Sequence, residues 1–144
     1  MKVESILRAK GDAVETVGPD APVRLAVHRL ASRAIGALVV SGDGRRVEGL
    51  LAEREVVRGL AAHGTALLDL TVGQVMAHPV PTCSPGDHVT AVMATMTRTR
   101  NRHVPVVDGG RLCGLVSLGD VVKNRLDEME LEARVLRDAY IAGR

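Results

Sequence analysis

The stretch GLVSLGD, residues 114–120, places a hydroxyl and a carboxylate where a predicted strand gives way to a predicted helix. Ser117 and Asp120 are three residues apart, so both side chains reach the first turn of that helix. A carboxylate can accept hydrogen bonds from two adjacent hydroxyl groups, and the N–H groups of a helix N-terminus attract phosphate. The same two side chains could instead only cap the helix, and taken alone the stretch favours that interpretation.

The chain that must position these residues has 144 amino acids, of which 46% are hydrophobic. That is enough to bury a core as one compact domain or as two small intertwined ones. The formal net charge of +2 is too small to indicate general attraction to nucleic acid or to anionic lipid. Tyr140 is the one aromatic residue, so a planar ligand would have to lie between aliphatic side chains.

Several classes of protein are excluded by what the sequence lacks. Charges run through the N-terminal stretch MKVESILRAKGDAVETV, and no segment approaches the ~20 apolar residues that cross a bilayer. We therefore expect a cytoplasmic protein that makes no contact with the membrane. No nucleophile elbow, metal-binding histidine pair or phosphate-binding glycine loop is present, which predicts a non-enzyme.

The cysteines and most of the histidines also give no functional signal. Cys83 and Cys113 are isolated, with no C-x-x-C motif and no histidine at zinc-ligand spacing, which predicts two reduced, buried thiols and no metal site. Four histidines have no local partner and are expected on the surface: His28, His63, His78 and His88.

The chain contains an internal repeat. VETVGP (residues 14–19) and VPTCSP (residues 80–85) share the pattern V-x-T-h-x-P, where h is apolar, at a displacement of 66 residues (80 − 14). The same displacement aligns ALVVS (37–41) with HVPVV (103–107), both of strand type. It also superimposes apolar residues at helical spacing: Val23 on Val89, Ala26 on Val92, Val27 on Met93 and Leu30 on Met96.

Each half is therefore predicted as a short strand, a helix, two strands joined by a tight Gly/Asp turn, and a second helix. A unit of ~60 residues with this content is poorly stable alone, so the two β-α-β-β-α units should pack together as an intramolecular pseudo-dimer of mixed α/β (α+β) class. With Gly64 as a helix C-cap, we place the first unit at 1–68 and the second at 69–125. A helix that continues from the second unit is expected over 120–142.

Together the two copies resemble the tandem cystathionine-β-synthase (CBS) domain pair, also called the Bateman module. The resemblance rests on both V-x-T-h-x-P segments, on RNRHVPVVDGGRLCGLVSLGDVV (100–122) and on its weaker counterpart SRAIGALVVSGDGRRVEGLLAEREVV (32–57). It covers nearly the whole chain and indicates a stand-alone bacterial type. It implies a non-catalytic module that binds an adenine nucleotide (AMP, ADP, ATP, NAD or a relative) in the cleft between its halves.

The resemblance also implies which residues hold the nucleotide. Gly114, Ser117 and Asp120 match the family string G-h-h-[ST]-x-x-D, whose acid holds ribose hydroxyls and whose hydroxyl faces phosphate. The other wall of the cleft is expected from the linker at residues 10–12 and from the first half. The residues carried over by position are Lys10, Asp12, Ile35 and Gly36.

The basic run before the strand at 103–107 supplies the cationic part of the implied site. Arg102 and His103 stand where similar proteins carry residues that face phosphate, whereas Arg98 and Arg100 fit a solvated charged surface better. The same patch could bind nucleic acid, but the absence of stacking aromatic residues and the low net charge argue against that function.

The first half departs from the family pattern. Ala52 and Glu55 occupy the positions that match Ser117 and Asp120. Alanine removes the hydroxyl, and glutamate carries its carboxylate one methylene further into the space for a ribose. The segment from Glu53 to Glu55 is better explained as the charged first turn of a helix, so a second, symmetry-related site is in doubt.

The C-terminal segment carries an apolar stripe with a period of about 3.5 residues, typical of a coiled-coil seam. Such a stripe must be buried on the module itself or on a second copy, and family members form flat dimers, so we expect a homodimer. The regulated partner is not identified by the sequence, and a ligand-independent dimerisation scaffold stays open as an alternative. The seam residues are Val122, Leu126, Met129, Ala133, Leu136 and Tyr140.

Overall fold

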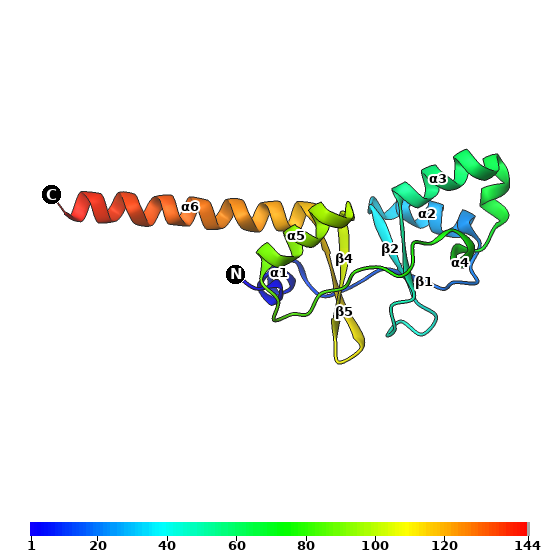
Figure 1. Cartoon of the computed structure of the whole chain (residues 1–144), viewed down its shortest axis with the longest axis horizontal. Coiled ribbons are helices and arrows are strands. Elements are labelled where there is room, and N and C mark those ends of the chain that lie inside the picture. The colour runs from blue at the N-terminus through cyan, green and yellow to red at the C-terminus, as the bar shows by residue number, and fades with distance from the viewer. Residues whose placement is uncertain (144) are drawn as a thin grey trace.

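The computed structural model describes residues 1–143 and shows two α/β halves side by side, with one long helix projecting from the second half (Figure 1). The first half contains β1 (Thr16–Val17), α2 (Val23–Arg33), β2 (Ala37–Val40), β3 (Gly49–Ala52) and α3 (Glu53–His63). The second contains α5 (Val89–Thr99), β4 (His103–Asp108), β5 (Arg111–Ser117) and α6 (Leu118–Ala142). The remaining elements are α1 (Val3–Lys10), the 3-10 helix η1 (Gly64–Asp69) and α4 (Val72–Val75).

The helices α2 and α5 confirm the repeat seen in the sequence. Each buries one face on its sheet, through Val23, Ala26 and Leu30 in α2 and through the aligned Val89, Val92 and Met96 in α5. Both helices are followed by a residue in the left-handed conformation, Ala34 at φ 52° and Arg100 at φ 58°, which are again 66 positions apart (100 − 34). The 11-residue helix α3 ends before Gly64, as the sequence predicted.

The sheets follow the predicted strand order, with two local differences. β1 pairs parallel with β2, which pairs antiparallel with β3, and β4 pairs antiparallel with β5. The expected first strand of the second half is reduced to one parallel bridge, Cys83 to Val106. The connection from β2 to β3 is not a tight turn but a loop over residues 41–48, because Asp43 accepts hydrogen bonds from the N–H groups of Arg45 and Arg46 and holds the chain in a wider bend.

The halves pack through their sheets, which confirms the intramolecular pseudo-dimer. Ala37, Val39 and Leu50 of the first sheet are buried against Leu112 and Leu115 of β5. Separate clusters fill the space between each sheet and its helices. The module therefore has one apolar layer in each half and a third between them.

The short helix that leads into each half packs on the other half. Val3 and Ile6 of α1 belong to the core of the second half, and Val72 of α4 belongs to the core of the first. Figure 1 shows the same exchange, with α1 beside α5 and α4 beside the first half. Packing thus divides the chain differently from the sequence repeat, because residues before 11 and residues near 72–76 cross over.

Helix α6 leaves the module after its first turns. Of its 25 residues only Val121 is buried, and residues 129–143 are exposed throughout. The predicted seam residues lie on this projecting rod (Figure 1). Within residues 1–143 no helix is both long enough and apolar enough to span a bilayer. The cytoplasmic location stays a prediction.

Candidate functional site

Ser117 and Asp120 form a reciprocal cap at the start of α6. The Asp120 N–H donates to Ser117 Oγ at 3.1 Å, and the Ser117 N–H donates to Asp120 Oδ2 at 2.9 Å. The strand β5 ends at Ser117, so the cap fixes both side chains at the junction that the sequence indicated. Ser117 and Asp120 therefore do cap the helix. The capping bonds leave Asp120 Oδ1 without a hydrogen bond among the described residues.

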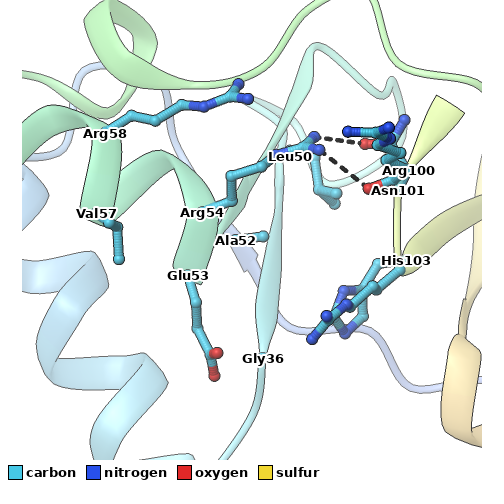
Figure 2. Close-up of a pocket in the computed structure, with 11 residues that line it drawn as sticks. Gly36, Leu50, Ala52, Glu53, Arg54, Val57, Arg58, Arg100, Asn101 and His103 are labelled. Atoms are coloured by element: carbon cyan, nitrogen blue, oxygen red, sulfur yellow. Dashed lines mark hydrogen bonds between the residues drawn. The ribbon is translucent and has the colours of Figure 1, made fainter.

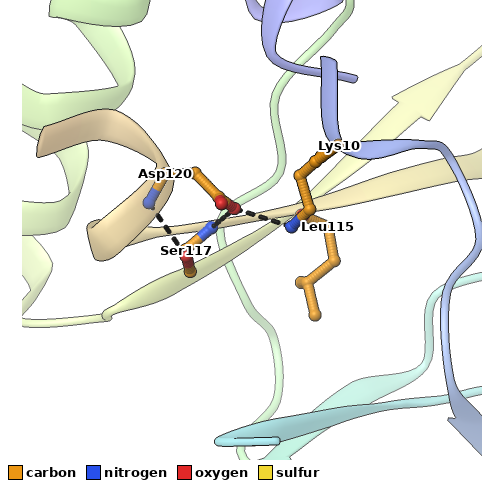
Figure 3. A network of polar contacts seen from close by, with 4 residues as sticks. All are labelled: Lys10, Leu115, Ser117 and Asp120. Carbon is orange, nitrogen blue, oxygen red and sulfur yellow. Dashed lines mark hydrogen bonds and ion pairs between the residues drawn. The ribbon is translucent and has the colours of Figure 1, made fainter. Parts of the chain in front are cut away.

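Lys10 from the end of α1 completes this junction (Figure 3). Its ammonium donates to Asp120 Oδ2 at 2.6 Å and to the backbone oxygen of Leu115 at 2.9 Å. Burial disfavours ionisation of Asp120, but the hydrogen bonds from Lys10 and Ser117 outweigh it and hold the pKa of this carboxyl below its usual range. Asp120 is thus an anion whose nearest counter-ion is a flexible side chain that is 37% exposed.

Five of the predicted site residues line one cleft between the halves. This cleft, which we call the Ser117 cleft, has a volume of about 380 Å³. Its walls also include the apolar side chains of Val14, Ala37 and Leu115. Asp120 does not line this cleft: it binds Lys10 and lines a small separate pocket of about 140 Å³ between α1 and α6. The predicted residues that line it are Lys10, Ile35, Gly36, His103 and Ser117.

Arg102 lines a neighbouring cleft. This second cleft, the Arg54 cleft, has a volume of about 470 Å³ and lies between the start of α3 and residues 100–103 (Figure 2). Arg54 crosses between the halves and donates to the Arg100 carbonyl at 3.0 Å and to Asn101 Oδ1 at 2.8 Å. Arg98 and Arg100 are both exposed, which agrees with their assignment to a solvated surface, and Arg100 also lines this cleft.

The two clefts meet at Gly36 and His103. Both residues line both clefts, and a Cβ on Gly36 would lie 3.0 Å from Cε1 of the His103 ring, so a larger residue at position 36 would require the imidazole to shift. Burial lowers the pKa of His103, with the positive charges of Lys10 and Arg102 acting in the same direction and Glu53 and Asp120 against it. The imidazole is therefore mainly neutral at pH 7 and poised to gain a proton beside an anion.

Besides Asp120, two of the predicted residues line neither cleft. Asp12 is exposed and lines neither cleft. Gly114 is buried, and a Cβ there would come within 2.5 Å of Cδ2 of Leu7 on α1. The matching Gly49 receives Met76 and Ala77 in the same way. At both positions the absence of a side chain leaves room for the segment that leads into the other half, so the role of the motif glycine is in packing.

Replacing Gly114 with alanine tests this packing role. The added methyl must displace Leu7, and overpacking of this kind costs typically 1–3 kcal/mol of folding free energy. We expect Gly114→Ala to lower the denaturant midpoint without changing the affinity for any ligand of the Ser117 cleft. A variant of normal stability that has lost ligand binding would return Gly114 to the binding site.

The junction in the first half confirms that Glu53, Arg54 and Glu55 form the first turn of a helix. Glu55 is 6% exposed, and its Oε2 accepts from the Ala52 N–H at 2.9 Å while Oε1 pairs with Arg54 at 3.4 Å. From the length of the glutamate side chain we expected its carboxylate to enter the space for a ribose. Instead, the carboxylate is folded back on its own helix. The chain therefore presents one Ser/Asp junction.

Sequence reasoning missed the Arg54 cleft. The segment from Glu53 to Glu55 was interpreted only as the charged first turn of a helix. Arg54 and Arg58, four residues apart, lie on one helix face and line this cleft together with Arg100 and Arg102. That spacing was the available signal. It could not show which surface the two side chains face, because the cleft is formed only when the halves pack.

The remaining candidates carry no chemistry. Cys83 and Cys113 are free thiols, buried and half-buried, and burial raises the pKa of Cys83 to about 12. His28, His63, His78 and His88 are exposed, as predicted. Among residues 1–143, no three His, Cys, Asp or Glu side chains come close enough together to hold a metal ion.

Comparison with known families matches the CBS domain twice, at residues 6–62 and 72–127. The chain belongs to the CBS-domain family. It is a tandem CBS pair, a regulatory module, as the resemblance implied.

Individual relatives agree with this assignment. The crystal structure of the CBS-domain containing protein ATU1752 from Agrobacterium tumefaciens has a TM-score of 0.82 and 42% identity, over 86% of this chain and 92% of that one. The mitochondrial CBS domain-containing protein CBSX3 of Arabidopsis thaliana is 30% identical over 98% of this chain and 72% of its own length. A structure of CBSX2 in complex with AMP has a TM-score of 0.74 and 21% identity, over 89% of this chain and 98% of that one, and shows the shared fold.

Proposed function

We propose that this CBS pair is a non-catalytic regulatory module that binds an adenine nucleotide in the Ser117 cleft and transmits the nucleotide state to a partner protein. The observation that carries the proposal is that Lys10, Ile35, Gly36, His103 and Ser117, each selected from the sequence, line one cleft. Its volume of about 380 Å³ lies within the range of small-molecule sites. The AMP complex of CBSX2, which shares the fold, supports the ligand class.

Each part of a nucleotide has a matching surface. Val14, Ile35 and Leu115 supply aliphatic walls for the base. The ribose hydroxyls would bind the carboxylate of Asp120. Its Oδ1 has no partner among the described residues, and at Oδ2 the hydroxyls would bind beside Lys10 or replace it. The ammonium of Lys10, released by the ribose, would then be free to meet phosphate.

The phosphate is expected at His103. This residue borders both clefts, so a phosphate beside it also approaches Arg102 and the other arginines of the Arg54 cleft. Both clefts are built from both halves of the module, and the ligand would stabilise one arrangement of the halves over others. A partner protein can respond only to that difference.

Calorimetry of AMP binding tests the proposal through the proton on His103. Its pKa is lowered in the free protein, and an adjacent phosphate dianion would raise it, so binding near pH 7 should take up protons and affinity should rise as the pH falls toward 6.5. The groups that set this balance are Lys10 on α1, Glu53 on α3, Asp120 on α6, and Arg102. We expect the measured enthalpy to depend on the ionisation enthalpy of the buffer.

The variant His103→Gln and the ligand adenosine are the controls. Both should remove the dependence on buffer, because the first lacks the titrating ring and the second lacks the phosphate. Binding of AMP with no proton uptake would mean that the phosphate lies away from His103. No heat and no thermal shift with AMP, ADP, ATP or NAD would contradict the nucleotide proposal and leave the dimerisation scaffold.

A further inference from the structure

The apolar seam of α6 is exposed along its whole length in the single chain. Leu126 is 59% exposed, Met129 52% and Leu136 71%. The helix covers 25 residues, and from Val122 to Tyr140 the seam extends for roughly 27 Å at 1.5 Å per residue. Monomeric proteins rarely expose a continuous apolar stripe of this length.

The seam is not the face with which α6 meets its own module. Val121, Asn124, Arg125 and Glu128 form the module-facing stripe, with Val121 buried and the other three half-buried, so Arg125 lies at the border between this stripe and the seam. Glu128 also pairs with the N-terminal ammonium at 3.5 Å. Leu118 and Val122 stay 41% and 45% exposed beside the module, so the seam is open from its base and a partner can bind without displacing the module.

The charges beside the seam are self-complementary for one orientation only. With Leu126 and Ala133 at heptad position a and Met129 and Leu136 at d, position g is held by Arg125 and Glu132 and position e by Glu130 and Arg137. In a parallel pair, each g residue meets the e residue five positions on in the other helix. We call each such g–e contact a rung. Both rungs join opposite charges: Arg125 faces Glu130 of the partner subunit, and Glu132 faces Arg137 of the partner subunit.

The antiparallel arrangement with the same seam overlap is disfavoured. There, g residues meet g residues and e residues meet e residues. Glu132 would face Glu132 of the partner subunit, Glu130 would face Glu130 of the partner subunit, and Arg137 would face Lys123 of the partner subunit. Three kinds of like-charge contact, the last occurring twice by symmetry, replace the attractive ones, and like charges at such positions destabilise the pair.

We propose that α6 pairs with α6 of a second copy as a parallel, in-register, two-stranded coiled coil that joins two modules at the same end. We assign a second copy of the chain as the partner of the seam because the charges beside the seam complement themselves. Within residues 1–143, Glu132 and Arg137 have no ion pair of their own, whereas Arg125 and Glu130 pair with Glu128 and Arg134 on the same helix. The Glu132 rung therefore specifies the orientation, and the pairing needs no nucleotide.

Sedimentation equilibrium on the full chain tests the seam with a matched pair of variants. Leu126→Gln with Leu136→Gln removes four apolar side chains from the dimer, two in each subunit, while keeping a good helix former, and should raise the dissociation constant at least ~100-fold. Leu131→Gln with Val135→Gln changes residues of similar exposure, 56% and 58%, that lie off the seam, and should leave it unchanged. Equal effects from both pairs, or a monomeric wild-type chain, would overturn the proposal.

Orientation is tested by cross-linking and by charge. Leu136→Cys should form an inter-subunit disulfide under mild oxidation, because two d residues adjoin in a parallel pair, whereas Leu131→Cys should not. Arg137→Glu should weaken the dimer roughly 2- to 10-fold, and adding Glu132→Arg should restore it. In an antiparallel pair Arg137→Glu would meet Lys123 of the partner subunit and strengthen the dimer. That result, or cross-linking only through position 131, would overturn the parallel arrangement.

Discussion

Replacing Asp120 with asparagine should weaken AMP binding at least ~10-fold, while Glu55→Gln, at the matching position of the first half, should leave it unchanged. A hydrogen bond to a charged group contributes about 1.5–3 kcal/mol, which corresponds to a loss of roughly 10- to 150-fold. Both substitutions change a carboxylate at the third residue of a helix into an amide. Asp120 is in contact with two residues that line the Ser117 cleft, Lys10 and Ser117, whereas the Glu55 carboxylate is folded back onto the Ala52 N–H.

Asparagine is the informative substitution because Asp120 also holds the helix end. Alanine would remove the bond from the Ser117 N–H and the ion pair with Lys10, so a loss of binding could not be separated from a loss of about 1 kcal/mol of capping free energy. The asparagine amide oxygen can still accept from Ser117. The Asp120→Asn defect should also shrink for a 2′,3′-dideoxy nucleotide, which lacks the hydroxyls that the carboxylate would hold.

Calorimetry and thermal melting of the same samples decide between site and cap. If Asp120→Asn binds AMP normally and melts earlier, the residue is a cap only and the nucleotide lies elsewhere. If Glu55→Gln is the damaging change, the ligand occupies the first-half junction. The Arg54 cleft would then be the site to examine, since it adjoins Glu53 and Ala52.

The helices and strands were predictable because the spacing of apolar residues is the same in both copies of the repeat. Val23, Ala26 and Leu30 share both their spacing and their burial with Val89, Val92 and Met96, so one displacement predicted two helix faces. The exchange of lead-in helices was not predictable in this way. The apolar face of α1, with Val3 and Ile6 buried, shows that the helix must pack on something but not on which of two similar cores.

The candidate site was predictable in membership and less so in arrangement. Positional matching selected Lys10 and Ser117, which the fold brings together at Asp120 from opposite ends of the chain. It could not reveal that Lys10 itself occupies the carboxylate, because a contact across 110 positions depends on how α1 crosses to the other half. For the same reason it assigned Gly114 to the ligand when its neighbour is Leu7.

Cutting the chain between residues 68 and 69, at the boundary that the repeat suggests, should give two fragments that do not fold alone and that assemble when mixed. Fragment 1–68 loses Val72 from its core and the paired hydrogen bonds between Leu50 and Ala77, at 2.9 and 3.0 Å. Fragment 69–144 loses Val3 and Ile6. Each buried aliphatic side chain contributes about 1.5–3 kcal/mol, against a total stability of typically 5–15 kcal/mol for a domain.

Circular dichroism and proton NMR would follow each fragment and their equimolar mixture. The added control is a peptide of residues 1–12, which should increase the structure of fragment 69–144, while the same peptide with Val3→Asp should not, because an unpaired charge cannot enter that core. Cooperative melting of either fragment by itself would mean that the lead-in contacts are dispensable and that the sequence boundary is also the folding boundary. Failure of both alone, with recovery on mixing, would mean that each half is completed by a helix from the other, so that the two walls of the Ser117 cleft form in one folding event.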